Sequence, residues 1–143
     1  MKRLFDPVEL HDRAPTEDDF LEQVLTGLRR PQKTTPSKFL YDRRGSQLFD
    51  QICELREYYP TRTEIGIMTA HAPEMARLCG SGCLLFEYGS GSSTKTPILL
   101  DCLDAPAAYA PIDISREHLI HSAAAVAARY PDQRVTPLCA DFT

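Results

Sequence analysis

The sequence contains no tryptophan, and it has no apolar run approaching the roughly 18 residues that a membrane-spanning helix needs. Its start, Met1-Lys2-Arg3, is followed by only two apolar residues before Asp6-Pro7, too few for the apolar region of a secretory signal. We therefore expect a cytoplasmic protein that neither crosses nor binds a membrane.

Basic residues are fewer than acidic ones. The chain has 16 basic and 20 acidic residues in 143, a formal net charge of −4. Nucleic-acid binding needs a basic face that neutralises phosphates, and the short pair Arg43-Arg44 does not supply one. We therefore expect no nucleic-acid partner.

The five cysteines are odd in number and scattered, at positions 53, 79, 83, 102 and 139. Only Cys79 and Cys83 are close in sequence, and no second pair or nearby histidine completes a zinc site. We expect reduced, mostly buried thiols. His118 and His121 share a helix face without a third ligand, so we expect solvent-exposed side chains and no metal.

The first half of the chain is predicted to be helical. Residues 1–15 look like a loosely held tail, and three helices should follow. The first runs from Thr16 to Arg30, and the second is capped by Ser46. The third has a capping-box pattern at Thr61 and Glu64, a kink or break at Pro73 and an end at Gly80 or Gly82. The apolar residues expected to be buried are Phe20, Leu21, Val24, Leu25 and Leu28 in the first helix, Leu48, Phe49, Ile52 and Leu55 in the second, and Ile65, Ile67, Met68 and Met75 in the third.

The second half alternates between strands and helices. Strands are predicted at 83–87, 107–114 and 134–140, with helices at 94–103 and 116–129. This alternation predicts an α/β fold with a parallel, Rossmann-like sheet. Right-handed crossovers would build the sheet in one direction, leaving one edge of the first strand unpaired. We therefore expect the N-terminal part of a longer protein, with a helical segment (1–80) and an incomplete sheet domain (81–143).

The most informative segment is the loop Gly89-Ser90-Gly91-Ser92-Ser93-Thr94-Lys95-Thr96, which follows the first strand. A phosphate-binding loop would need glycine in place of Thr94 before Lys95-Thr96. A dinucleotide fingerprint also fails at Thr94. The glycine-rich loop of a class I methyltransferase needs only an acid followed by G-x-G, and Glu87, Gly89 and Gly91 satisfy it.

A carboxylate lies at the carboxyl end of each predicted strand. Asp113 is spaced from the loop as an acid that binds ribose hydroxyls would be, although it could instead only cap the next helix. Asp141-Phe142 could bond an adenine amine and pack on its ring. Glu87, Asp113 and Asp141 are therefore expected to form the rim of a nucleoside pocket, because ligands bind at the carboxyl ends of parallel strands.

Three blocks of sequence resemble the histidine-specific N-alpha-methyltransferases that make hercynine (trimethylhistidine) in ergothioneine biosynthesis. The first is Lys38-Phe39-Leu40-Tyr41-Asp42-Arg43-Arg44-Gly45-Ser46-Gln47-Leu48-Phe49, and the second is Glu57-Tyr58-Tyr59-Pro60-Thr61-Arg62-Thr63-Glu64. The third is the glycine-rich loop with Asp113 and Asp141-Phe142 downstream. The first two strings are specific, whereas the loop alone would not be.

The resemblance implies a class I fold that uses S-adenosyl-L-methionine, with an N-terminal helical segment over the cofactor. It also implies L-histidine as substrate, with most of the histidine pocket in a second domain. We expect the full-length protein to be a monomer. Residues that match the family's cofactor contacts are Tyr41, Gly89, Lys95, Asp113, Asp141 and Phe142. Tyr58 matches a contact to the substrate.

Elementary chemistry supports some of these roles and leaves others open. Lys95 suits the methionine carboxylate of the cofactor, although a solvent-facing helix lysine is the plain alternative. Tyr41 and Tyr58 could orient an amine, or could simply be partly buried. No catalytic base can be assigned. Other possibilities are an N-methyltransferase for another amino acid, a cofactor-binding module without turnover and, less favoured, an ATPase.

Overall fold

The structure is a computed structural model that describes residues 8, 10–14 and 17–142. Its helices and strands follow one another along the chain. They are β1 (His11–Arg13), α1 (Glu17–Arg29), the 3-10 helix η1 (Ser37–Leu40), α2 (Arg43–Glu54), α3 (Pro60–Cys79), β2 (Leu84–Tyr88), α4 (Thr96–Leu100), β3 (Ala108–Asp113), α5 (Arg116–Arg129) and β4 (Leu138–Ala140). None of the described helices is both long and apolar enough to span a bilayer.

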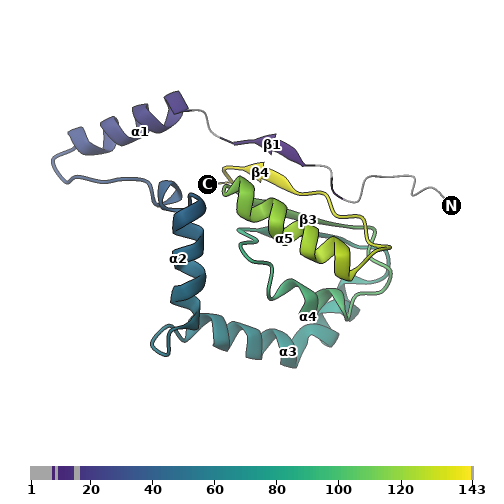
Figure 1. Cartoon of the computed structure of the whole chain (residues 1–143). Coiled ribbons are helices and arrows are strands. Elements are labelled where there is room, and N and C mark those ends of the chain that lie inside the picture. Colours follow the sequence, from purple (N-terminus) through teal and green to yellow (C-terminus); the bar gives the residue numbers. More distant parts are fainter. Residues whose placement is uncertain (1–7, 9, 15–16, 143) are drawn as a thin grey trace.

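The strands form one parallel sheet in the order β1-β4-β3-β2 (Figure 1). Strand β2 pairs with β3 from Leu84 opposite Ala108 to Tyr88 opposite Ile112. The predicted α/β class and parallel sheet are therefore confirmed. Among the described residues, no strand lies on the other side of β2, as expected for crossovers that build in one direction.

The expectation of a loosely held tail is wrong for residues 11–13. These residues form β1, which pairs with β4 so that His11 lies opposite Leu138, and the amide of His11 donates to the carbonyl of Pro137 over 2.9 Å. The edge of β4 offers unpaired backbone groups, and this short segment satisfies them. Residues 1–7, 9 and 15 lie outside the described residues.

The last strand is shorter than the predicted 134–140. Strand β4 begins at Leu138 because Pro137 has no amide hydrogen for the ladder, although Val135 still forms isolated bridges to Val8 and Tyr109. Helix α5 has the predicted bounds. Helix α4 is only one turn and a half, within the predicted 94–103.

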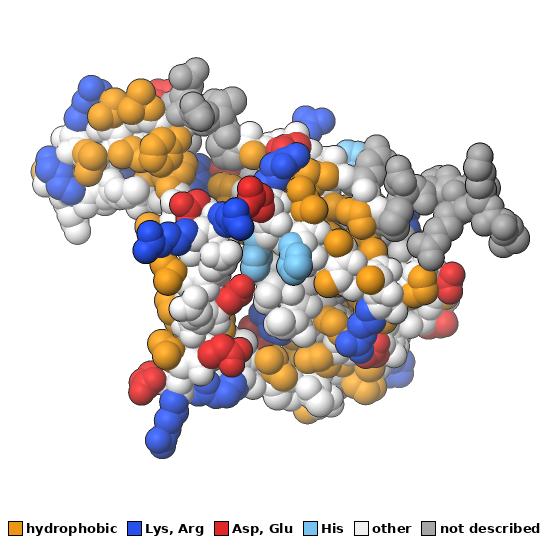
Figure 2. Space-filling model, viewed as in Figure 1, with side chains coloured by type: hydrophobic (Ala, Val, Ile, Leu, Met, Phe, Trp, Pro, Cys, Tyr) orange, Lys and Arg blue, Asp and Glu red, His pale blue; other side chains and the backbone are white. Residues whose placement is uncertain are grey.

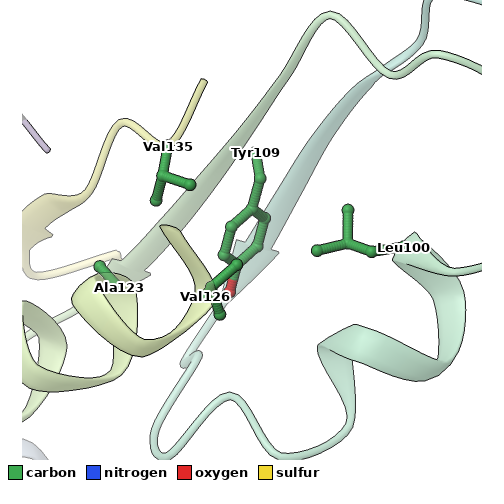
Figure 3. Close-up of a cluster of buried hydrophobic side chains, with 5 residues drawn as sticks. All are labelled: Leu100, Tyr109, Ala123, Val126 and Val135. Atoms are coloured by element: carbon green, nitrogen blue, oxygen red, sulfur yellow. The ribbon is translucent and has the colours of Figure 1, made fainter. Parts of the chain in front are cut away.

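The core lies between α5, α4 and the sheet. Tyr109 is fully buried at its centre, surrounded by Leu100, Ala123, Val126 and Val135 (Figure 3). These side chains come from β3, α4, α5 and the segment before β4. The core therefore joins three consecutive units of the alternating pattern, and it lies directly behind the glycine-rich loop.

The apolar residues of α1 and α2 are largely exposed, contrary to the burial predicted from their spacing. Apolar side chains gather on the surface over α1 and along α2 (Figure 2). The exposed ones are Phe20, Leu21, Leu25 and Leu28 in α1, and Leu48, Phe49, Ile52 and Leu55 around α2. Helical periodicity identifies the apolar face of a helix but not what covers it. Thr16, the predicted start of α1, lies outside the described residues.

The predicted starts of α2 and α3 are both corrected. Asp42 caps α2 by accepting the amide of Gly45 at 2.7 Å, and Ser46 lies inside the helix, buried. Helix α3 begins at Pro60, and proline is favoured at the first position of a helix. The predicted capping box does not form, because no side chain caps this helix.

Helix α3 is continuous through Pro73, where we expected a kink or a break, and there is no break. Ala72 and Ala76, on either side of Pro73, are buried, whereas Ile67 and Met75 are exposed. Proline removes one helical hydrogen bond, and packing of α3 along α4 supports the helix despite that loss.

None of the five cysteines forms a disulfide. Only Cys139 is buried, Cys53 and Cys83 are half-buried, and Cys79 and Cys102 are exposed, so the prediction of mostly buried thiols is wrong. Burial raises the pKa of the Cys139 thiol to about 11, with a smaller contribution from the charge of Asp12.

Two glycines give matched tests of the helical segment. A Cβ on Gly45 would lie 1.6 Å from the carbonyl oxygen of Leu40, whereas one on Gly66 would meet nothing within 4 Å. We expect Gly45→Ala to lower the free energy of unfolding by about 1–3 kcal/mol, as over-packing does. Gly66→Ala should raise it by up to about 1 kcal/mol, because alanine favours a helix. Urea denaturation measures both, and equal stability of the two variants would contradict the tight turn at Gly45.

Candidate functional site

A cavity of about 770 Å³ opens where the carboxyl ends of the strands face η1, α2 and the start of α3. All six residues predicted to contact a cofactor line this cavity, and they come from both halves of the chain. They are Tyr41, Gly89, Lys95, Asp113, Asp141 and Phe142. The fold thus brings together side chains that are up to a hundred residues apart in sequence.

The glycine-rich loop turns tightly after β2. Gly89 and Gly91 have φ angles of +67° and +49°, which glycine adopts without strain. The amides of Gly89 and Ser90 both donate to the carbonyl of Ile112, at 2.8 and 3.2 Å. The third positive φ angle, +51°, falls on Ser93 and not on Thr94, so the position where a phosphate-binding loop has glycine does not need one here.

Asp113 links the loop to the next helix. One oxygen, Oδ2, accepts the amide of Gly91 at 2.9 Å, and Oδ1 accepts the amide of Ser115, the residue before α5, also at 2.9 Å. The carboxylate therefore organises the start of α5, as the alternative interpretation held, and it also lines the cavity. A carboxylate has about four lone-pair sites, so these two bonds leave it able to accept from further hydroxyls.

Glu87 does not lie on the cavity rim, and the expectation of a rim of three acids is wrong for this residue. Its Oε2 accepts the hydroxyl of Tyr109 at 2.5 Å and that of Thr96 at 2.6 Å, behind the loop. Burial first, and then the charge and hydrogen bond of Glu87, raise the pKa of Tyr109 well above its ordinary value.

Two charged residues of the cavity, Lys95 and Asp141, form ion pairs with residues of the N-terminal segment. Lys95 Nζ lies 2.7 Å from Glu64 Oε2 on α3, and Lys38 Nζ on η1 lies 2.5 Å from Asp141 Oδ2. The side chain of Lys95 is only 31% exposed, so it is not the solvent-facing lysine of the alternative interpretation. An ammonium group has three donors, so the pair with Glu64 leaves Lys95 able to bind a second acceptor.

Aromatic side chains cover one side of the cavity. The rings of Tyr41 and Phe49 meet edge to face at 5.9 Å, and Phe49 meets Tyr58 in the same way at 5.9 Å. Tyr41 and Phe49 line the cavity, whereas Tyr58 is half-buried behind Phe49. Phe142 also lines the cavity, and its ring packs on Tyr88 at 5.7 Å.

The structure adds three residues that sequence reasoning missed. Ser90 is buried on the cavity, and its hydroxyl has no hydrogen-bond partner among the described residues. Lys38 lies in a sequence block that resembles the family, but nothing in the sequence indicated that it would meet Asp141. His118, expected to be solvent-exposed, lines the cavity with its Nε2 atom 3.8 Å from Asp50 Oδ2. His121 is exposed.

Metal ligands do not gather at this site. Within the described part of the chain, no three histidine, cysteine, aspartate or glutamate side chains are placed to hold a metal ion.

Comparison with known proteins gives consistent similarities. Residues 20–143 match the profile of a family described as "Histidine-specific methyltransferase, SAM-dependent". The chain is 40% identical over 122 residues to the histidine N-alpha-methyltransferase of Mycobacterium tuberculosis and 42% identical over 122 residues to that of Mycolicibacterium smegmatis. In both cases the match covers 83% of this chain and 38% of the relative.

A fungal relative is similar over a smaller share of its own length. Ergothioneine biosynthesis protein 1 of Neurospora crassa is 41% identical over 112 residues, which is 74% of this chain and 13% of the fungal protein. The chain therefore spans well under half the length of each of these relatives.

The buried phenol of Tyr109 makes stability sensitive to alkali. Below pH 10 the phenol is protonated in both folded and unfolded chains, so its contribution is complete. Above pH 10 only the unfolded chain ionises, so the free energy of unfolding should fall by about 1.4 kcal/mol per pH unit from this group. Tyr130, whose pKa burial and Asp101 raise to about 12, adds to the fall.

Urea denaturation between pH 9 and 12 measures this slope, at values chosen to bracket the tyrosine pKa of about 10. Tyr109→Phe should remove the part of the slope that Tyr109 contributes. A near-ultraviolet phenolate signal from Tyr109 in a chain whose circular dichroism is still native would contradict the buried, protonated phenol.

Proposed function

The chain belongs to the family of histidine-specific, SAM-dependent methyltransferases, and from that premise we propose that its cavity binds S-adenosyl-L-methionine (SAM). The complete protein, on this proposal, methylates the α-amino group of L-histidine to hercynine, the first step of ergothioneine biosynthesis. The activity is proposed for the whole protein because this chain spans 38% of the length of its mycobacterial relatives.

The observation that carries the proposal is the convergence of six matched residues on one cavity. We assign the ribose hydroxyls to Asp113, whose carboxylate retains acceptor capacity beside the loop. Asp141 and Phe142 are assigned to the adenine amine and ring. Lys95 is assigned to the methionine carboxylate, since an ammonium group suits a single carboxylate oxygen.

The cofactor supplies a methyl group already activated by the sulfonium, so the protein's task is mostly binding and orientation. Holding two reactants in line can lower a barrier by roughly 7–11 kcal/mol. Tyr58 is proposed as a contact to the substrate histidine, and its ring is held by the edge of Phe49. The histidine ammonium must lose a proton before transfer, and we assign that base to no described residue.

The two parts of the chain have separate roles in this proposal. Residues 1–80 cover the cofactor site, to which they are joined by the pairs Lys38–Asp141 and Glu64–Lys95. Residues 81–143 form the first half of the methyltransferase sheet. We further propose that the whole protein is a cytoplasmic monomer that acts on a small amino acid and binds neither nucleic acid nor membrane.

Binding is tested first, with S-adenosylhomocysteine and 5′-methylthioadenosine as probes. Both share the adenosine group, but only the first carries the amino-acid end. We expect Lys95→Met to weaken S-adenosylhomocysteine binding by at least tenfold, as loss of a charge-assisted hydrogen bond of about 1.5–3 kcal/mol does. Binding of 5′-methylthioadenosine should change little. Isothermal calorimetry measures both.

Lys33→Met is the matched control, because Lys33 bonds only the carbonyl of Arg30 on the surface among the contacts observed for its side chain. It should leave both affinities unchanged. Tighter binding of ATP than of S-adenosylhomocysteine by the wild-type chain would contradict the cofactor assignment and favour an ATPase.

Turnover is tested by mass spectrometry with SAM and L-histidine, using this chain and the full-length protein. The expected products of the full-length protein are histidine carrying one, two and three methyl groups. Methylation of a different amino acid in preference to histidine would overturn the substrate assignment and keep the reaction type. Cofactor binding without any methylated product from the full-length protein would support a binding module instead.

A further inference from the structure

A cluster of hydroxyl groups lies behind the glycine-rich loop, on the side away from the cavity. The hydroxyl of Tyr109 on β3 donates to Glu87, the last acid before the loop, at 2.5 Å. It also lies 3.2 Å from the hydroxyl of Ser93 within the loop and 3.4 Å from that of Thr96 at its end. One phenol therefore contacts the strand just before the loop, the middle of the loop and its last residue.

The cluster contacts the loop residue whose backbone conformation is the least favourable. Ser93 has a φ angle of +51°, in the left-handed region that side-chain-bearing residues rarely adopt. It is buried, its amide donates to the carbonyl of Ser90 at 2.8 Å, and its hydroxyl meets Tyr109. Such a conformation persists only where its surroundings hold it in place.

Tyr109 is itself held by the core. Its ring is fully buried among Leu100, Val126 and Val135 (Figure 3), so its hydroxyl cannot move to follow the loop. Burial and the nearby charge of Glu87 keep the phenol protonated and able to donate. The hydroxyl therefore has a fixed position, and the loop contacts it there.

We propose that Tyr109 is a positioning residue whose hydroxyl, through Glu87, Ser93 and Thr96, holds the loop in the conformation that receives the amino-acid end of the cofactor. The proposal rests on the proposed function for the identity of the ligand. Its physical basis, a phenol that fixes a strained loop, is independent of that ligand. Tyr109 does not line the cavity, so it acts only through the loop.

The chain offers a closely matched control. The hydroxyl of Tyr130 also donates to a carboxylate, Asp101 Oδ1, at 2.5 Å, and neither residue lines the cavity. Tyr109→Phe and Tyr130→Phe therefore each remove one phenol-to-carboxylate bond and keep the ring. Only the first removes a contact to the glycine-rich loop.

The test measures two properties of the folded wild-type chain and of the two variants. The first is the ratio of affinities for S-adenosylhomocysteine and 5′-methylthioadenosine. For Tyr109→Phe we expect this ratio to fall about tenfold, the equivalent of one buried hydrogen bond. The second is hydrogen exchange, where the Gly91 and Ser93 amides should become less protected. Tyr130→Phe should change neither property.

A purely structural role would lower thermal stability and leave the affinity ratio and the loop amides unchanged, and that result would overturn the proposal. Faster loop exchange in a chain whose wild type binds neither ligand would support the positioning role and overturn the proposed function instead. If Tyr109→Phe does not fold, Ser93→Ala removes the loop hydroxyl that Tyr109 contacts. An unchanged ratio and unchanged loop exchange in that variant would overturn the proposal.

Discussion

The register between β2 and β3 is the constraint on which the site depends. With Tyr88 opposite Ile112, the amides of Gly89 and Ser90 reach the Ile112 carbonyl, and the carboxylate of Asp113 reaches the next turn of the loop. Tyr109 lies four residues before Asp113, on the same face of the strand. A slip of one residue would move both side chains to the other face, separating the loop from the groups that hold it.

The N-terminal segment is attached to this frame in a different way. Its contacts with the cavity side of the sheet include the ion pairs Lys38–Asp141 and Glu64–Lys95, whereas the apolar residues of α1 and much of α2 face outward. Partly exposed ion pairs contribute little stability and are weakened by salt. The sheet is thus fixed by a buried core. The helical cover meets it through the packing of α3 along α4 and through these ion pairs, two of whose four groups belong to residues assigned to the cofactor.

Much of the second half of the chain was predictable because its signals are local. Alternating strand and helix patterns gave the parallel sheet, and the bounds of α5 follow from its residues alone. Strand β1 was not predictable, since three exposed residues become a strand only when the edge of β4 lies beside them. The role of Glu87 was missed for a similar reason. Its partner Tyr109 is 22 residues away and looked like one more apolar strand residue.

The same contacts explain why the loop suits a nucleoside with an amino-acid end better than a nucleotide phosphate. A phosphate-binding loop directs its backbone amides at the anion. Here the Gly91 amide donates to Asp113, and the amides of Gly89 and Ser90 donate to Ile112. These donors are occupied by the protein, and a carboxylate lies where phosphate charge would be repelled. The polar groups that line the cavity include the carboxylate of Asp113, the ammonium of Lys95 and the buried hydroxyl of Ser90, which has no partner among the described residues. A ligand with few negative charges and several hydroxyl groups matches that set.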